Sequence, residues 1–130
     1  MSQTILIVDD DEMTRRVLRL YCLRNGFEVF EAEDGQQALT LIENKCPNLV
    51  IMDVLMPVMD GFTTVRNIRT KLDCAALPIL FLTSRADSKA KNTGLEMGAQ
   101  RFLNKPINLG ELVKVIKELL TESWVIKEAQ

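Results

Sequence analysis

Five short apolar segments alternate with longer amphipathic segments along the chain. The short segments are ILIV, FEVFEA, NLVIM, PILFLT and RFLN, at residues 5–8, 27–32, 48–52, 78–83 and 101–104. Their lengths and their content of β-branched and aromatic residues predict β-strands. The first and fourth segments are apolar almost throughout rather than alternating, which is typical of strands that are covered on both faces of a sheet.

The segments between these strands carry residues at helical spacing. In three of them these residues are Met13, Val17, Leu20, Tyr21 and Arg24; Ala38, Leu41 and Ile42; and Phe62, Val65, Ile68 and Leu72. This spacing predicts three helices. A fourth helix is predicted from Ser88 to Met97, where Gly98 ends it. A fifth is predicted from Leu109, with Asn108 as its N-cap and Glu111 as the capping-box partner.

Strands and helices therefore alternate five times. Such alternation predicts an α/β fold, in which a parallel sheet is covered by helices on both faces. The five-stranded doubly wound sheet of order 2-1-3-4-5, the flavodoxin-like architecture, accommodates this pattern. We expect one domain over residues 1–121, followed at 122–130 by a C-terminal tail or helix extension in which Trp124 continues the apolar stripe of the last helix.

The composition narrows the range of functions. The 130 residues are 47% hydrophobic and 26% charged with a net charge of -2, which predicts a globular protein without direct nucleic-acid binding. We find neither a leader peptide nor an apolar run long enough to span a bilayer, so we expect a cytoplasmic protein without membrane contact. Cys22, Cys46 and Cys74 are widely spaced, which suggests neither a disulfide framework nor a zinc site.

The chain contains no histidine. This absence excludes Ser-His-Asp and Cys-His catalysis and most transition-metal sites. The remaining chemistry must use carboxylates, hydroxyls and amines.

Polar residues stand at the carboxyl ends of four of the predicted strands, as the last residue or directly after it. They are Asp9 and Asp10, then Asp53, Thr83 and Lys105. Because the carboxyl ends of parallel strands share one edge of the sheet, we expect these side chains to meet. Three carboxylates favour a hard divalent cation, and a half-open site suits Mg²⁺ better than Ca²⁺. A hydroxyl and an ammonium group beside that cation could stabilise a phosphoryl group in transfer, with Asp53 as the nucleophile.

Other acidic residues have a structural interpretation. Asp11 is predicted to cap the first helix, where its charge meets the positive end of the helix dipole. Asp34-Gly35 and Asp60-Gly61 are predicted turns that open the next two helices.

Four motifs together resemble the receiver domain of two-component response regulators (CheY-like). They are ILIVDDDE at 5–12, PNLVIMDVLMPVMDG at 47–61, PILFLTSRAD at 78–87 and GAQRFLNKP at 98–106. The resemblance covers residues 4–121. It implies a signalling switch rather than an enzyme, in which Asp53 takes a phosphoryl group from a histidine kinase or histidine phosphotransfer protein and the chain catalyses only its own phosphorylation and dephosphorylation.

The resemblance also implies a role for each site residue. Asp10, Asp53 and the backbone carbonyl of Leu55 would bind Mg²⁺ directly, and Asp9 would act mainly through a bound water. Thr83 would donate a hydrogen bond to a phosphoryl oxygen, and Lys105 would pair with another. A cis peptide bond before Pro106 is implied as well.

Signalling would depend on Thr83 and Phe102. In the family the threonine moves toward the phosphoryl group while an aromatic residue turns inward, which changes the face formed by the fourth helix, fifth strand and fifth helix. Many relatives carry Tyr where this chain has Phe102, so no hydroxyl is offered there. Leu55 and Arg85 occupy positions that often set the lifetime of the phosphoryl group.

Three alternatives remain open from the residues. An aspartyl phosphatase would need a second carboxylate two residues after Asp53, where Leu55 stands. A flavin-binding protein would need neutral donors after the first strand, where DDDE repels phosphate. A receiver that has lost phosphorylation is the third. The sequence identifies neither the kinase nor the output, which would be a downstream protein or a fused effector domain, and it leaves a homodimer open.

Overall fold

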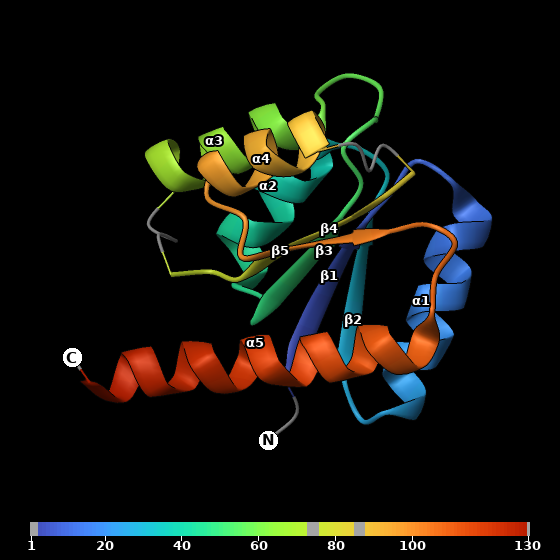
Figure 1. The fold of residues 1–130 in the computed structure, drawn as a ribbon, viewed down its shortest axis with the longest axis vertical. Coiled ribbons are helices and arrows are strands. Elements are labelled where there is room, and N and C mark those ends of the chain that lie inside the picture. The colour runs from blue at the N-terminus through green and yellow to red at the C-terminus, as the bar shows by residue number, and fades with distance from the viewer. Residues whose placement is uncertain (1–2, 73–75, 85–87, 130) are drawn as a thin grey trace.

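The computed structural model describes residues 3–72, 76–84 and 88–129 as five strands that alternate with five helices. The strands are β1 (Thr4–Val8), β2 (Glu28–Ala32), β3 (Leu49–Met52), β4 (Ile79–Thr83) and β5 (Arg101–Asn104). The helices are α1 (Glu12–Arg24), α2 (Gly35–Lys45), α3 (Gly61–Lys71), α4 (Ser88–Glu96) and α5 (Leu109–Ala129). All strand pairs are parallel and the sheet order is β2-β1-β3-β4-β5, which confirms the predicted fold (Figure 1).

The predicted strands agree with the observed ones to within one residue at each end. Helix α5 continues to Ala129, and the domain boundary at residue 121 stays a prediction. Arg85, Cys74 and the side chain of Trp124 lie outside the part of the chain that the structure describes.

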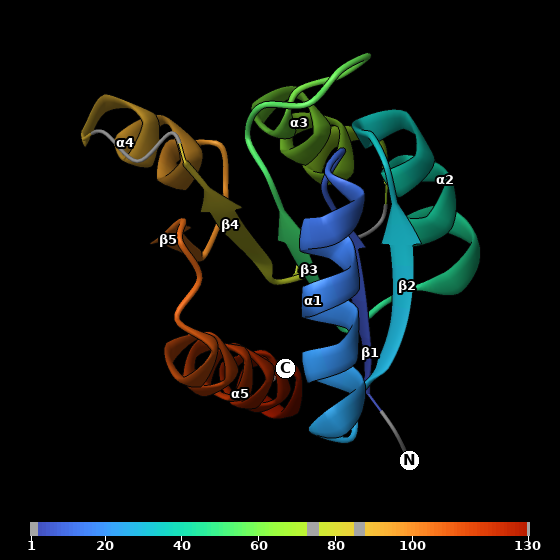
Figure 2. The same cartoon turned by 90° about the vertical axis from the view of Figure 1, so that its right-hand side faces the viewer.

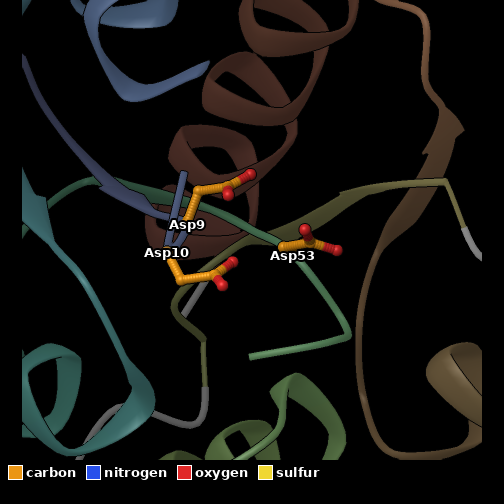
Figure 3. A group of neighbouring side chains, drawn as sticks. All are labelled: Asp9, Asp10 and Asp53. Carbon is orange, nitrogen blue, oxygen red and sulfur yellow. The ribbon is translucent and has the colours of Figure 1, made fainter. Parts of the chain in front are cut away.

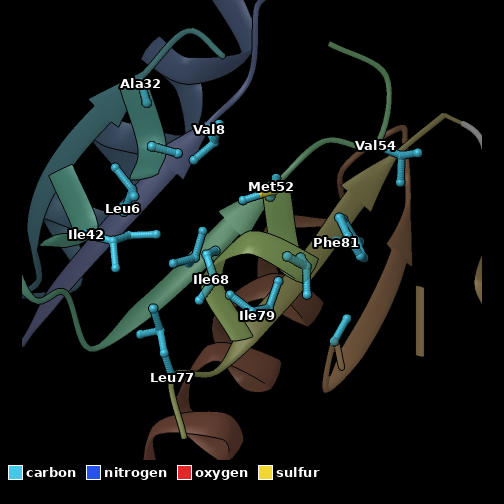
Figure 4. Packing of buried hydrophobic residues seen from close by; sticks show 14 residues of the cluster. Leu6, Val8, Ala32, Ile42, Met52, Val54, Ile68, Leu77, Ile79 and Phe81 are labelled. Atoms are coloured by element: carbon cyan, nitrogen blue, oxygen red, sulfur yellow. The ribbon is translucent and has the colours of Figure 1, made fainter. Parts of the chain in front are cut away.

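Alternate residues of the central strands enter two separate cores. Leu6 and Val8 of β1 face a cluster with α2 and α3, whereas Ile5 and Ile7 face a second cluster with α1 and α5. Figure 4 shows the first cluster, in which Phe81 of β4 is fully buried. Figure 1 shows α5 on one side of the sheet and α2, α3 and α4 on the other. This burial on both faces explains why the central strands have continuous apolar sequences.

The first helix forms as predicted, but most of the apolar residues that indicated it do not pack against the sheet. Met13, Val17 and Leu20 are 62%, 39% and 54% exposed on α1, the helix that faces the viewer in Figure 2. Leu18 and Cys22 pack against the sheet instead. Because α1 carries apolar residues on more than one face, the period predicts the helix but not which side is buried. Burial raises the pKa of the Cys22 thiol to about 11, so Cys22 is an unreactive core residue.

Four helices begin at the predicted capping residues. Asp11, Asp34, Asp60 and Asn108 each accept a hydrogen bond from the backbone N–H three residues later, at 3.1, 2.9, 2.7 and 3.0 Å. These bonds satisfy donors that the first helical turn leaves without partners. Each cap therefore fixes where its helix starts, and the loop before it delivers the strand-end residues to one edge of the sheet.

Within the described residues, no helix combines the length and the apolar character needed to cross a bilayer.

Candidate functional site

The register of the sheet brings two of the predicted carboxylates side by side. Val8 of β1 pairs with Met52 of β3, and Asp9 and Asp53 are the residues that follow them. The backbone N–H of Asp53 donates to the carbonyl of Val8 at 3.0 Å, and that of Asp9 donates to Ala32 at 3.2 Å. Both aspartates are therefore held by sheet hydrogen bonds up to the point where their side chains leave the strand.

Asp9, Asp10 and Asp53 form one acidic cluster. One carboxylate oxygen from each residue lies within 4.8 Å of the other two, and Figure 3 shows the three side chains leaving two neighbouring strand ends. Asp9 and Asp53 are only 3% and 7% exposed, whereas Asp10 is open to solvent. The prediction that these three side chains meet is confirmed, and their site is half open.

Lys105 joins the cluster from the end of β5. Its Nζ donates to Asp9 Oδ2 at 2.8 Å and to Asp53 Oδ2 at 3.0 Å. Its backbone N–H donates to the carbonyl of Thr83 at 2.9 Å, which ties the end of β5 to the end of β4. The Lys105-Pro106 peptide bond is cis, as predicted. An ammonium group thus bridges the two buried carboxylates.

Burial and the ion pairs act in opposite directions on the pKa values of Asp9 and Lys105. Burial raises the pKa of Asp9 above its usual value, although the hydrogen bonds from Lys105 and from the Asp11 backbone act in the opposite direction. Burial alone would lower the pKa of Lys105, but its hydrogen bonds to Asp9 and Asp53 and the charges of those carboxylates outweigh burial and raise it. Lys105 is therefore charged at neutral pH, and Asp9 still lacks full compensation.

The chemistry of the cluster fits a hard divalent cation. Carboxylate oxygens are the ligands that Mg²⁺ prefers, and a half-open site leaves room for the waters that it retains. The backbone N–H of Leu55 points to Asp53 Oδ1 at 3.4 Å, and the Leu55 side chain is 54% exposed beside the cluster.

Thr83 and Phe102 lie on the β4–β5 side of the site. Thr83 is fully buried at the end of β4 and pairs with Asn104 of β5. The half-buried ring of Phe102 contacts the ring of Phe81, with centroids 5.9 Å apart. A Cβ added at Gly94 of α4 would lie 3.2 Å from the Phe102 ring, so the glycine permits close packing of ring and helix. Thr83 and Phe102 thus lie on neighbouring strands, β4 and β5, which pair with each other beside the acidic cluster.

Two residues that the sequence interpretation missed also shape the site. Arg15 of α1 is only 8% exposed and donates to the backbone carbonyl of Asp9 at 2.6 Å. Gly61 starts α3 so close to the site that an added Cβ would lie 2.4 Å from the carbonyl oxygen of Asp53. The Asp60-Gly61 turn was a signal for the glycine, but nothing local in the sequence indicates the partners of Arg15.

Comparison with a family model shows which protein family has this arrangement of residues. The model for the response regulator receiver domain matches residues 5–117, which include every residue of the acidic cluster and Lys105. The chain belongs to the response regulator receiver family. Receiver domains are the signalling modules of two-component systems and bind Mg²⁺ at an acidic cluster of this kind.

Relatives and solved structures agree with the assignment. The chain is 42% identical over 120 residues to the response regulator MprA of Mycobacterium sp., covering 92% of this chain and 51% of that protein. The structure of CheY4 from Vibrio cholerae matches with a TM-score of 0.87 at 33% identity, covering 92% of this chain and 99% of that chain. A CheY-like receiver protein from Methanospirillum hungatei matches at 0.89 and 30%, covering 95% and 97%.

The chain spans about half the length of the curated relatives that it matches.

Proposed function

We propose that this receiver domain accepts a phosphoryl group on Asp53 from the phosphohistidine of a partner histidine kinase or histidine phosphotransfer protein. A carboxylate oxygen of Asp53 attacks the phosphorus, the phosphorus–nitrogen bond breaks, and the imidazole leaves with the electron pair. The product is an acyl phosphate. The observation that carries this proposal is the meeting of three carboxylates with the Lys105 ammonium group around Asp53.

Asp10 and Asp53, with the backbone carbonyl of Leu55, are the groups that would hold Mg²⁺, and Asp9 would contribute mainly through a bound water. The bound cation would neutralise charge on the carboxylates and on the phosphoryl oxygens. Support for this assignment comes from the oxygen-only donor set and from the exposure of Asp10.

Lys105 has a second task once Asp53 is modified. Its Nζ lies 3.0 Å from Asp53 Oδ2, so a phosphoryl oxygen added to Asp53 would come within reach of the ammonium group. Thr83 would donate its hydroxyl to another phosphoryl oxygen, and Phe102 would turn inward as Thr83 moves. The face of α4, β5 and α5 would then present a different surface to a downstream protein or a fused effector domain.

Intact-mass measurement after incubation with acetyl phosphate and Mg²⁺ tests the proposal. We expect the mass to rise by one phosphoryl group, in an adduct that is stable to acid and labile to base. Asp53→Asn should abolish the adduct, because an amide is not a comparable nucleophile. A matched control, Asp34→Asn, makes the same chemical change at a helix cap and should leave the adduct intact.

Two results would contradict the proposal. One is the absence of any adduct in the unmodified chain, and the other is an adduct that persists in Asp53→Asn. Repeating the measurement with a phosphorylated histidine kinase would test the donor class separately, because acetyl phosphate needs no protein contact.

A further inference from the structure

Arg15 is a buried charge next to the metal-binding turn. Its side chain is 10% exposed, and it reaches from α1 across to β2 and the turn that follows. Its Nε lies 3.5 Å from Glu31 Oε1, and its Nη2 lies 3.9 Å from Glu33 Oε1. Burying a guanidinium group is costly unless its donors find partners, so this arrangement requires a reason.

The third contact of Arg15 points to that reason. Nη1 donates to the backbone carbonyl of Asp9 at 2.6 Å. This carbonyl belongs to the peptide group that joins Asp9 to Asp10, and the rotation of that group sets where the Asp10 carboxylate points. Arg15 therefore binds the backbone between Asp9 and Asp10, two members of the acidic cluster.

The other polar atoms of Asp9 are held as well. Its N–H donates to Ala32 at 3.2 Å, and its Oδ1 accepts from the Asp11 backbone at 2.9 Å. The exposed Asp10 side chain, repelled by two neighbouring carboxylates, would otherwise gain by rotating away from them. Ligands that are held in place before the ion arrives lose less freedom when they bind it, so a fixed Asp9-Asp10 peptide would favour Mg²⁺ binding.

Charge alone does not explain the presence of Arg15 there. Arg15 and Arg19 stand one helical turn apart, and together they balance the charges of Glu31 and Glu33. Because these four side chains carry no net charge together, they change the electric field at the acidic cluster little. The contact of Arg15 with the Asp9 carbonyl therefore explains its place better than its charge does.

We propose that Arg15 is a positioning residue for the magnesium site, which fixes the Asp9-Asp10 peptide so that Asp10 is held ready to bind the ion. The inference rests on the magnesium site of the proposed function. Arg15 itself contacts neither the ion nor the phosphoryl group.

The test compares Arg15→Met with Arg19→Met. Arg19 also pairs with Glu31, at 3.0 Å, but it makes no hydrogen bond to Asp9 among the described residues, so the two variants lose the same charge and share one ion-pair partner. Mg²⁺ affinity is measured by titration calorimetry and by the amide NMR shifts of Asp10 and Asp53. We expect Arg15→Met to weaken Mg²⁺ binding by about 10-fold and Arg19→Met to change it by about twofold or less.

Phosphorylation from acetyl phosphate gives an independent measurement. In Arg15→Met the half-saturating Mg²⁺ concentration should rise by the same factor while the rate at saturating Mg²⁺ stays near that of the unmodified chain. A general loss of structure would lower the saturated rate instead. If Arg15→Met does not fold, Arg15→Lys takes its place; it keeps the charge but loses the planar fork, so we expect binding several-fold weaker than in the unmodified chain.

The possible outcomes distinguish the positioning role of Arg15 from the proposed Mg²⁺ site on which it rests. If the unmodified chain binds no Mg²⁺, the proposed metal site is wrong and the inference falls with it. If the unmodified chain binds Mg²⁺ and the Arg15 variant binds it equally well, only the positioning role is overturned. Equal weakening in Arg15→Met and Arg19→Met would also overturn that role, because it would show an effect of charge.

Discussion

Aspartates at the starts of helices and aspartates at the ends of strands behave differently in this molecule. Asp11, Asp34 and Asp60 each accept a backbone N–H from the first turn of their own helix. Asp9 and Asp53 are buried, face another carboxylate and share Lys105. The first group is satisfied by neighbours three residues away, whereas the second also depends on Lys105, which comes from a distant part of the chain.

The contrast is sharpest between Asp9 and Asp11, two residues apart. Burial raises the pKa of Asp9, whereas hydrogen bonds from the Thr14 hydroxyl and backbone lower the pKa of Asp11. A run of like charge in the sequence therefore divides into a part that gains from a cation and a part that gains from a helix end.

The largest expected effect comes from removing one carboxylate at a strand end. Asp10→Asn should weaken Mg²⁺ binding by roughly 100-fold, because a charged ligand becomes a neutral one. It should leave the free energy of unfolding unchanged or raise it slightly, since a repelling charge is lost. Asp34→Asn is the matched control and should leave the affinity unchanged. Titration calorimetry and urea unfolding measure both quantities, and unaltered affinity in Asp10→Asn would remove Asp10 from the site.

The next effect concerns the place where a helix start touches a strand end. Gly61→Ala should lower the free energy of unfolding by roughly 2 to 3 kcal/mol, because its Cβ would collide with backbone that cannot move aside. The added atom would lie 2.4 Å from the Asp53 carbonyl and 2.7 Å from the Phe81 ring. Phosphorylation should fall as well.

Gly110→Ala serves as the control for this substitution. The nearest atom to its added Cβ is Asn108 Oδ1 at 3.5 Å, so α5 has room for the methyl group. We expect a gain of about 0.5 kcal/mol in urea unfolding. Similar losses at both glycines would show that close approach to Asp53 is not the cause.

A smaller effect is expected at a helix start. Asp34→Ala should cost about 1 kcal/mol, because the N–H of Gln37 loses its acceptor, whereas Asp34→Asn should cost almost nothing, since asparagine caps equally well. Thermal or urea unfolding measures the difference. Equal costs for the two variants would mean that the charge of Asp34 matters more than its hydrogen bond.

The smallest effect is the pH dependence without Mg²⁺. The pKa of folded Asp9 lies above its unfolded value, so its contribution to stability is full below about pH 4 and is lost as pH rises through the folded pKa. The pKa of folded Asp11 lies below its unfolded value, so its contribution is present above about pH 4 and is lost as pH falls through the folded pKa. Carboxyl ¹³C NMR titration should give Asp9 the higher pKa. The reverse order would contradict the contrast between the two residues.

The strands and the acidic cluster could be predicted because their signals are local or topological. Each strand is a short apolar run between polar segments, and a parallel sheet then forces Asp9, Asp53 and Lys105 to one edge. Arg15 could not be predicted, because its partners are a backbone carbonyl and two glutamates on another strand and turn. The buried face of α1 could not be predicted for a related reason: packing against the sheet and α5 selects Leu18 over Leu20.

The Lys105 bridge has a consequence for how the molecule assembles. Lys105 lies 96 residues after Asp9 and 52 after Asp53, so this contact closes a loop over most of the chain. Asp9, Asp10 and Asp53 all lie in the first half of the chain. The ammonium group of Lys105 reaches them only when β5 has joined the sheet. Fragments that end before β5 would carry Asp53, the proposed acceptor, without its counter-ion. Reactivity at Asp53 should therefore report completed folding, and a split chain should recover it only when the β5 fragment is added back.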